Sequence, residues 1–199
     1  MPANAPANVA VGELARRGII NGYDAAAVPP LFCPGDATLR HQLAALLVRA
    51  MPGWGAETWP NTFTDPTPDA ELWRRVATLQ HHGVVGGYAA ASCTAEGKAP
   101  PCYGPTEPVL RPQAISFVTR AMVAQGYWQQ QPVNPALYGG ALAGTGHEQD
   151  ASTYWYYTRA RGGVPDYPEA GGFPVGEAAP RAWFARLLWT ALQGSPAAP

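Results

Sequence analysis

One ordered set of landmarks occurs three times along this 199-residue chain, and this repetition constrains the fold more than any other feature. Each copy has a glycine-containing turn that ends in tyrosine, then an aromatic residue closely followed by proline, then an arginine. The turns span residues 18–23, 83–88 and 162–167, the third being the loosest match. The aromatic residues are Phe32, Tyr103 and Phe173, and the arginines eight positions later are Arg40, Arg111 and Arg181. An acidic residue precedes each arginine by four positions: Asp36, Glu107 and Glu177.

A helical period of apolar residues follows each of these arginines. The three stripes are Leu43, Leu46, Leu47, Ala50 and Met51; Ala114, Phe117, Val118, Ala121 and Met122; and Phe184, Leu187, Leu188, Ala191 and Leu192. The spacing predicts that each copy ends in an amphipathic helix with one buried face. The acid near its start suits the exposed N–H groups and the helix dipole.

A second helix is predicted before each turn. Its inward residues are Val11 and Leu14 in the first copy and Leu72, Val76 and Leu79 in the second, and it is aromatic around residues 154–157 in the third. The turn glycines stand where a helix ends on a residue with positive φ. The sequence therefore predicts a mainly α protein built from three helix–loop–helix repeats.

The repeats also set the expected organisation of the chain. Repeat one spans residues 1–51, repeat two spans 63–122, and repeat three spans 150–192. Residues 52–62 and 123–149 are linkers, and 193–199 form a tail. The interval between turn and arginine is longest in repeat two, because it includes a loop insertion between Cys93 and Cys102.

The charge and the hydropathy of the chain exclude two classes of partner. The formal net charge is −1 and the isoelectric point is about 6.4, so no global field attracts a nucleic acid. No apolar run approaches the roughly 20 residues that cross a bilayer, so we expect no membrane span. The 22 glycines and 22 prolines favour many loops, while seven tryptophans and nine tyrosines supply apolar volume for a core.

The cysteines bear on the compartment. Cys93 and Cys102 bracket a turn-rich loop, which favours a disulfide and an oxidising environment, the alternative being two free thiols. Cys33 is expected to be a packed small residue. No signal peptide is visible, because the Pro/Ala/Asn-rich residues 1–8 lack a basic region and an apolar region. We therefore expect either an intracellular chain or one recorded after removal of a signal.

The repeat resembles the S-layer homology family. That family's repeat carries a Phe-x-Asp opening, a Gly-Ile-Ile-x-Gly-Tyr turn, a Phe-x-Pro loop and a Thr-Arg-Ala-Glu motif that opens a helix. Residues 63–65 match the opening and residues 18–23 match the turn. The resemblance implies three repeats in a pseudo-threefold, three-pronged arrangement around a central helical bundle. It covers roughly residues 9–51, 63–122 and 150–192.

The resemblance also implies a function. Such domains are non-catalytic and extracellular, and anchor bacterial surface proteins to secondary cell-wall polysaccharide, often pyruvylated, in grooves between the prongs. The matching residues are Arg40, Arg111 and Arg181 for the motif arginine and Gly22 and Gly87 for the turn glycine, with Asp166 in the third copy. The motif threonine and glutamate are missing from all three copies, which keeps a second hypothesis open: a structural subunit of a surface layer or appendage that assembles through protein–protein contacts.

The residue types fit an anionic sugar. Arginine offers a planar, permanently charged fork to a carboxylate, and a helix N-terminus adds outward N–H groups. The turn tyrosines Tyr23, Tyr88 and Tyr167 could stack on sugar faces, and the glycines let the backbone approach. In the alternative interpretation each arginine pairs with the preceding acid or with a neighbouring repeat, and the tyrosine rings fill the core.

Catalytic and metal chemistry find little support in the sequence. The pair His81–His82 precedes a glycine at a helix C-terminus, where positive charge is favourable. Cys33 and His41 have no second pair at metal-ligand spacing, and no serine lies in a nucleophile motif. We therefore expect no enzyme, no metal and no cofactor. Trp54, Trp59 and Trp128 in the linkers are expected to pack under loops, or else to form surface contacts.

Overall fold

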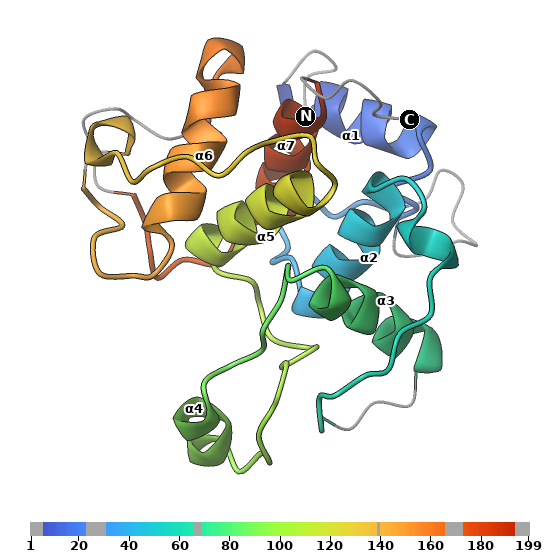
Figure 1. Cartoon of the computed structure of the whole chain (residues 1–199). Helices are drawn as coiled ribbons and strands as arrows, with labels where there is room; N and C mark the ends of the chain where they lie inside the picture. The colour runs from blue at the N-terminus through green and yellow to red at the C-terminus, as the bar shows by residue number, and fades with distance from the viewer. Residues whose placement is uncertain (1–5, 23–30, 66–68, 139, 166–172, 194–199) are drawn as a thin grey trace.

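A computed structural model gives the structure of residues 6–22, 31–65, 69–138, 140–165 and 173–193 (Figure 1). Within these residues the chain is mainly helical, as the sequence predicts, and its β-structure is limited to isolated bridges. The α-helices are α1 (Pro6–Arg16), α2 (Arg40–Ala50), α3 (Ala70–His81), α4 (Ala90–Ala95), α5 (Arg111–Ala124), α6 (Glu148–Thr158) and α7 (Arg181–Leu192). Three short 3₁₀ helices are η1 (Trp54–Ala56), η2 (Pro135–Leu137) and η3 (Arg159–Arg161).

Helices α2, α5 and α7 begin at the three repeated arginines, and their apolar stripes supply much of the core. The acids were expected near the helix starts, and each lies four residues before the first residue of its helix. The predicted glycine stops are confirmed, since Gly18 and Gly83 have φ of 71° and 69°. Helix α4, which contains Cys93 and extends into the loop before Cys102, was not predicted.

The arginine-bearing helices pack against helices that come from another predicted repeat. Helix α2 lies against α3, α5 lies against α6, and α7 lies against α1 at the opposite end of the chain (Figure 1). Contacts of α5 with both α2 and α7 join these pairs. A helix pair therefore contains the end of one predicted repeat and the start of another, so that no repeat buries its apolar faces alone.

A closed cycle of backbone hydrogen bonds joins the segments just before the three arginines. The Thr38 N–H donates to the Ala179 carbonyl, the Ala179 N–H donates to the Val109 carbonyl, and the Val109 N–H donates to the Thr38 carbonyl, each at 2.8 Å. All three residues are buried. Because buried backbone groups must be paired, this cycle fixes the positions of the three segments relative to one another.

The first residue of each arginine-bearing helix extends the same pattern outward. Its backbone N–H donates to the carbonyl of the acid in another repeat: Arg40 to Glu107 at 3.0 Å, Arg111 to Glu177 at 3.0 Å, and Arg181 to Asp36 at 2.8 Å. These contacts satisfy one of the N–H groups that a helix start leaves without an intrahelical partner. The repeated acids thus use their carbonyl groups to join the repeats.

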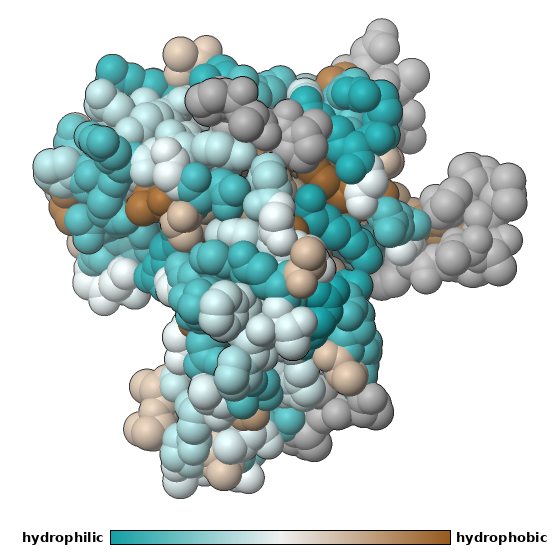
Figure 2. Space-filling view, turned by 45° about the vertical axis from the view of Figure 1, so that its right-hand side comes forward, coloured by the Kyte–Doolittle hydropathy of each residue, from teal (hydrophilic) through white to brown (hydrophobic). Residues whose placement is uncertain are grey.

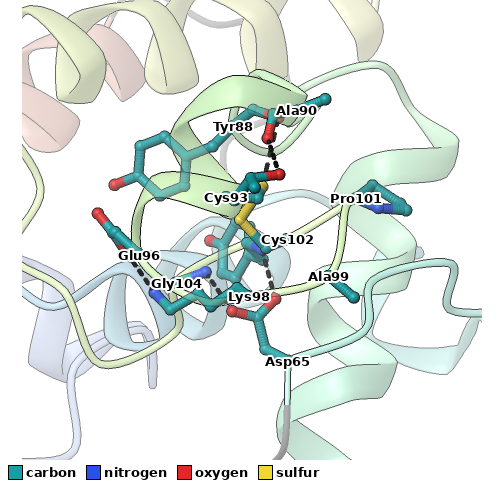
Figure 3. Close-up of a disulfide and its surroundings, with 12 residues drawn as sticks. Asp65, Tyr88, Ala90, Cys93, Glu96, Lys98, Ala99, Pro101, Cys102 and Gly104 are labelled. Carbon is teal, nitrogen blue, oxygen red and sulfur yellow. Dashed lines mark hydrogen bonds and ion pairs between the residues drawn. A yellow bond between two sulfur atoms is a disulfide. The ribbon is translucent and has the colours of Figure 1, made fainter.

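Helix α4 and its flanking segments project from the other helices (Figure 1). Cys93, within α4, forms a disulfide with Cys102, and their Cα atoms are 5.8 Å apart (Figure 3). The buried carboxylate of Asp65 accepts hydrogen bonds from the backbone N–H groups of Tyr103 and Gly104. These bonds hold residues 103–104, where the chain leaves the projection, against residues 63–65. On the face that Figure 2 shows, apolar residues form small separate patches rather than one broad surface.

Candidate functional site

The three arginines share a position in their helices but differ in surroundings. Each is the first helical residue after an extended residue. In two helices a glutamine stands in place of the motif glutamate and still caps the helix: the Leu39 N–H donates to Gln42 at 3.1 Å, and the Leu110 N–H donates to Gln113 at 3.2 Å. The amide oxygen accepts this bond as a carboxylate would, so the cap survives the missing charge.

Arg40 is enclosed by aromatic rings. Arg40 is 2% exposed, and its Nε donates to the Tyr103 carbonyl at 2.6 Å. The guanidinium carbon lies 4.5 Å from the ring centroids of both Tyr88 and Tyr103, and 5.4 Å from that of Phe117. Little of its surface remains for a ligand. The geometry matches the alternative interpretation, in which an arginine is bound by a neighbouring repeat.

The disulfide loop supplies further groups to the region around Arg40. Lys98 forms ion pairs with Glu96 at 2.7 Å and with Glu107, beside Tyr88 (Figure 3). Burial raises the pKa of Glu107, but hydrogen bonds from Lys98 and Tyr88 outweigh it and leave that pKa below its usual value. Burial raises the pKa of Tyr88 to about 12, against the opposing charge of Arg40. The cluster is a connected set of charged and phenolic groups that already have partners.

Arg111 has an intermediate environment. Its side chain is 19% exposed, and one guanidinium nitrogen lies 3.3 Å from the Glu177 carboxylate, which is itself mostly exposed. The guanidinium carbon lies 5.5 Å from the ring of Trp183, whose indole N–H donates to the Pro165 carbonyl. Trp183 stands where the other two helices have the capping glutamine. Arg111 is therefore bound by the acid of another repeat.

Arg181 lines a pocket. The guanidinium carbon lies 5.0 Å from the ring of Phe32, and the pocket, of about 230 Å³, is also lined by Gly22, Thr38 and His41. The floor is aliphatic, with Leu14, Leu46, Leu72 and Leu188 among its residues. Two predicted site residues from opposite ends of the chain, Arg181 and Gly22, thus meet in one pocket. Below, this is called the Arg181 pocket.

The Arg181 pocket contains polar residues that the sequence did not single out. Gln42 and Arg49 come from α2, Arg75 comes from α3, and Asp69 is the N-cap residue of α3. The Arg49 Nη1 donates to the Ile19 carbonyl at 3.3 Å. Arg49 has a counterpart in the second copy, Arg120, but its meeting with Arg75 depends on the packing of α3 against α2, so no sequence signal indicated it.

The remaining predicted site residues are placed as follows. Gly87 has φ of 75°, and a Cβ there would lie 2.5 Å from a ring carbon of Phe63 and 2.6 Å from the Cys102 carbonyl oxygen, so the backbone approach expected of this glycine serves internal packing. Gly22 has φ of 77°. Tyr23, Tyr167 and Asp166 lie outside the described residues. Of the three turn tyrosines, the structure thus describes Tyr88, whose ring stacks on Arg40.

Histidine and tryptophan side chains form a second cluster at the end of α3. The His82 ring stacks on Trp54 and its Nε2 lies 2.7 Å from a Glu57 oxygen, while the His81 ring stacks on Trp59. The linker tryptophans were expected either to pack under loops or to form surface contacts. Trp54 and Trp128 are buried, whereas Trp59 is 36% exposed. The histidines therefore hold the first linker against α3.

Other candidate chemistry is limited in the part of the chain that the structure describes. No group of three or more His, Cys, Asp or Glu residues there could hold a metal ion. Cys33 is a free thiol of intermediate exposure, less buried than expected. The Ser116 hydroxyl lies 2.8 Å from His147 Nδ1, but Ser116 is fully buried.

No helix among the described residues is both long and apolar enough to cross a bilayer, in agreement with the sequence prediction. No protein-family model matches the sequence, and no curated protein matches it.

Proposed function

We propose that this chain is a non-catalytic, extracellular module of the S-layer homology type, which anchors a bacterial surface protein to secondary cell-wall polysaccharide carrying pyruvate or a comparable anionic group. The observation that carries the proposal is the Arg181 pocket. It combines a guanidinium at a helix start, a turn glycine and an aliphatic floor. A ketal-linked pyruvate presents a carboxylate beside a methyl group, and both find matching surfaces there.

The pseudo-threefold, three-pronged fold is part of the same proposal. The cycle of hydrogen bonds among Thr38, Val109 and Ala179 supports it, since each segment donates to one neighbour and accepts from the other. The three helix pairs, α1 with α7, α2 with α3, and α5 with α6, are the proposed prongs. The disulfide between Cys93 and Cys102 supports an oxidising, extracellular location.

The proposed module uses one pocket rather than three equivalent ones. Arg40 is almost completely buried, and Arg111 is paired with Glu177. Binding at Arg181 alone gives no avidity within one module, so firm attachment needs several modules on one polymer or a well-formed pocket.

Sedimentation with purified cell walls tests this proposal. Wild type is expected to sediment with walls that retain their polysaccharide and to stay in solution with extracted walls. Arg181→Gln is expected to lose most of the binding, whereas Arg16→Gln, which removes a charge from an exposed ion pair on α1, is expected to keep it. Equal sedimentation of Arg181→Gln and wild type would contradict anchoring through this pocket.

The second candidate function is a structural subunit that assembles through protein–protein contacts. The internal pairing of Arg40 and Arg111 favours it, because two of the three motif arginines then serve structure. Trp59, partly exposed and held by the His81 ring and by a 2.9 Å bond to Glu57, offers a rigid contact residue. Size-exclusion chromatography at increasing concentration separates the two functions: a chain that stays monomeric and binds walls is an anchor.

A further inference from the structure

The Arg181 pocket has more positive charge than its motif arginine provides. Among the described residues that line it are three arginines, Arg49, Arg75 and Arg181, and one acid, Asp69. One Asp69 oxygen accepts the backbone N–H groups of Glu71 and Leu72, at 2.9 and 3.1 Å, and so caps α3. The acid is thus engaged in part by the start of its own helix, and the lining keeps an excess of cationic groups.

The positive charges are separated along helix α2. Arg181 lies at the end where α2 begins, because its N–H donates to the Asp36 carbonyl just before that helix. Arg49 belongs to the last turn of α2, and the pocket also includes Gln42 from the first turn. At 1.5 Å per residue, the seven steps from Gln42 to Arg49 correspond to about 10 Å. The pocket therefore has cationic side chains near both ends of α2.

Arg49 and Arg75 form the cationic pair at the far end. Both side chains line the pocket, from two helices that pack against each other, and desolvation and the charge of Arg75 lower the pKa of Arg49. Glu71 offsets this in part, but its carboxylate also binds Arg74 through two bonds of 2.7 Å while it binds Arg75 at 2.9–3.0 Å. One carboxylate shared by two arginines leaves a net positive charge at this end.

We propose that the Arg181 pocket binds a ligand with two anionic groups, one facing Arg181 and the other facing Arg49 and Arg75. This inference rests on the proposed function and narrows its substrate class: the polysaccharide unit carries a second charge, as a phosphate ester or a second carboxylate, beside the pyruvate. Two guanidinium groups that line one pocket from different helices suit either anion. Arg49 and Arg75 then determine specificity, while Arg181 contributes to every anionic ligand.

Calorimetric titration with defined sugars tests the inference. The probes are a pyruvylated disaccharide, the same disaccharide with an added phosphate ester, and the same disaccharide with a second carboxylate. Wild type is expected to bind at least one doubly charged probe about tenfold more tightly than the singly charged one. Arg75→Gln and Arg49→Gln are expected to bind the doubly charged probe no more tightly than the singly charged one. Arg181→Gln should weaken binding of all three, and the exposed control Arg16→Gln should change none.

The outcomes separate this inference from the function on which it rests. If wild type binds all three probes equally, or if Arg49→Gln and Arg75→Gln bind like wild type, the second subsite does not exist, although the anchoring function stands as long as Arg181→Gln is defective. If wild type binds no probe, both proposals fail. Because Arg49 also donates to the Ile19 carbonyl, the thermal unfolding of each variant is measured beside the titrations. If Arg49→Gln is unfolded, Arg75→Gln decides the result, since the Arg75 side chain is ion-paired and partly exposed.

Discussion

Replacement of Arg40 by alanine is expected to destabilise the fold strongly. The substitution removes a charge-assisted hydrogen bond to the Tyr103 carbonyl, worth about 1.5–3 kcal/mol, and a desolvated cation–π contact worth about 2 kcal/mol. The two buried methylenes beyond Cβ add about 1.6 kcal/mol. These losses are offset by several kcal/mol, because the folded variant no longer pays the cost of removing a guanidinium from water. The expected net loss in the free energy of unfolding is about 3–4 kcal/mol.

Arg111→Ala is the matched comparison, since Arg111 occupies the same helical position. Its ion pair with Glu177 spans 3.3 Å near solvent and its ring contact is longer, at 5.5 Å, so the expected loss is about 1 kcal/mol. Urea unfolding of the oxidised proteins, followed by circular dichroism, measures both values by linear extrapolation. For a chain of this size the Arg40 variant should melt roughly 6–16 °C below wild type.

The comparison can refute the assignment of Arg40 to internal structure. If Arg40→Ala lowers the free energy of unfolding no more than Arg111→Ala does, the aromatic enclosure contributes no net stability. Arg40 would then be a candidate ligand contact again. Unchanged stability together with reduced wall binding would show directly that Arg40 contacts the polysaccharide. A slope of the unfolding curve that differs from wild type would instead indicate a change in the unfolded state or a loss of two-state behaviour.

Three further predictions concern stability. Burial raises the pKa of Tyr103 to about 12, above its unfolded value of about 10. Because the folded state keeps the phenol proton to higher pH, this tyrosine contributes up to about 2.7 kcal/mol to the free energy of unfolding below pH 10, and the contribution is lost as the pH rises to 12. Urea unfolding at several pH values across this range measures the loss. Reduction of the disulfide between Cys93 and Cys102 opens a loop of about ten residues and should cost about 2.7 kcal/mol, as seen by comparing unfolding with and without dithiothreitol. Gly87→Ala places a Cβ 2.5 Å from an aromatic carbon at positive φ and should cost more than about 2 kcal/mol, whereas Gly86→Ala, with open space around it, should change the melting temperature little.

The helices were predictable because their signals are local. The period of apolar residues after each arginine is a property of the helix itself, and it indicated α2, α5 and α7 correctly. The hydrogen-bond cycle could not be predicted in the same way. Thr38, Val109 and Ala179 have different side chains, and what they share is a backbone position two residues before each arginine. Backbone pairing between distant segments leaves no pattern in side-chain type.

The candidate site was predictable in part. A repeated arginine and a turn glycine pointed to Arg181 and Gly22, which do line one pocket. The sequence did not show that Arg40 is enclosed by aromatic rings or that Arg111 is paired with Glu177. Arg49 and Arg75 were missed because they lie on polar faces of two helices, and a polar face carries no information about its neighbour until the helices are packed.

The segment with the loop insertion gives Arg40 surroundings that differ from those described for Arg181. Arg40 and Arg181 both lie near an aromatic residue from another repeat, Tyr103 and Phe32 respectively. At Arg40 the second repeat adds the ring of Tyr88, and the inserted loop adds Lys98, which pairs with Glu107. These residues occupy the volume and satisfy the charges that a ligand would otherwise need. Under the proposed function, the number of binding sites follows from what the loops contain rather than from how many times the motif is repeated, because the groups that enclose Arg40 come from the segment that carries the insertion.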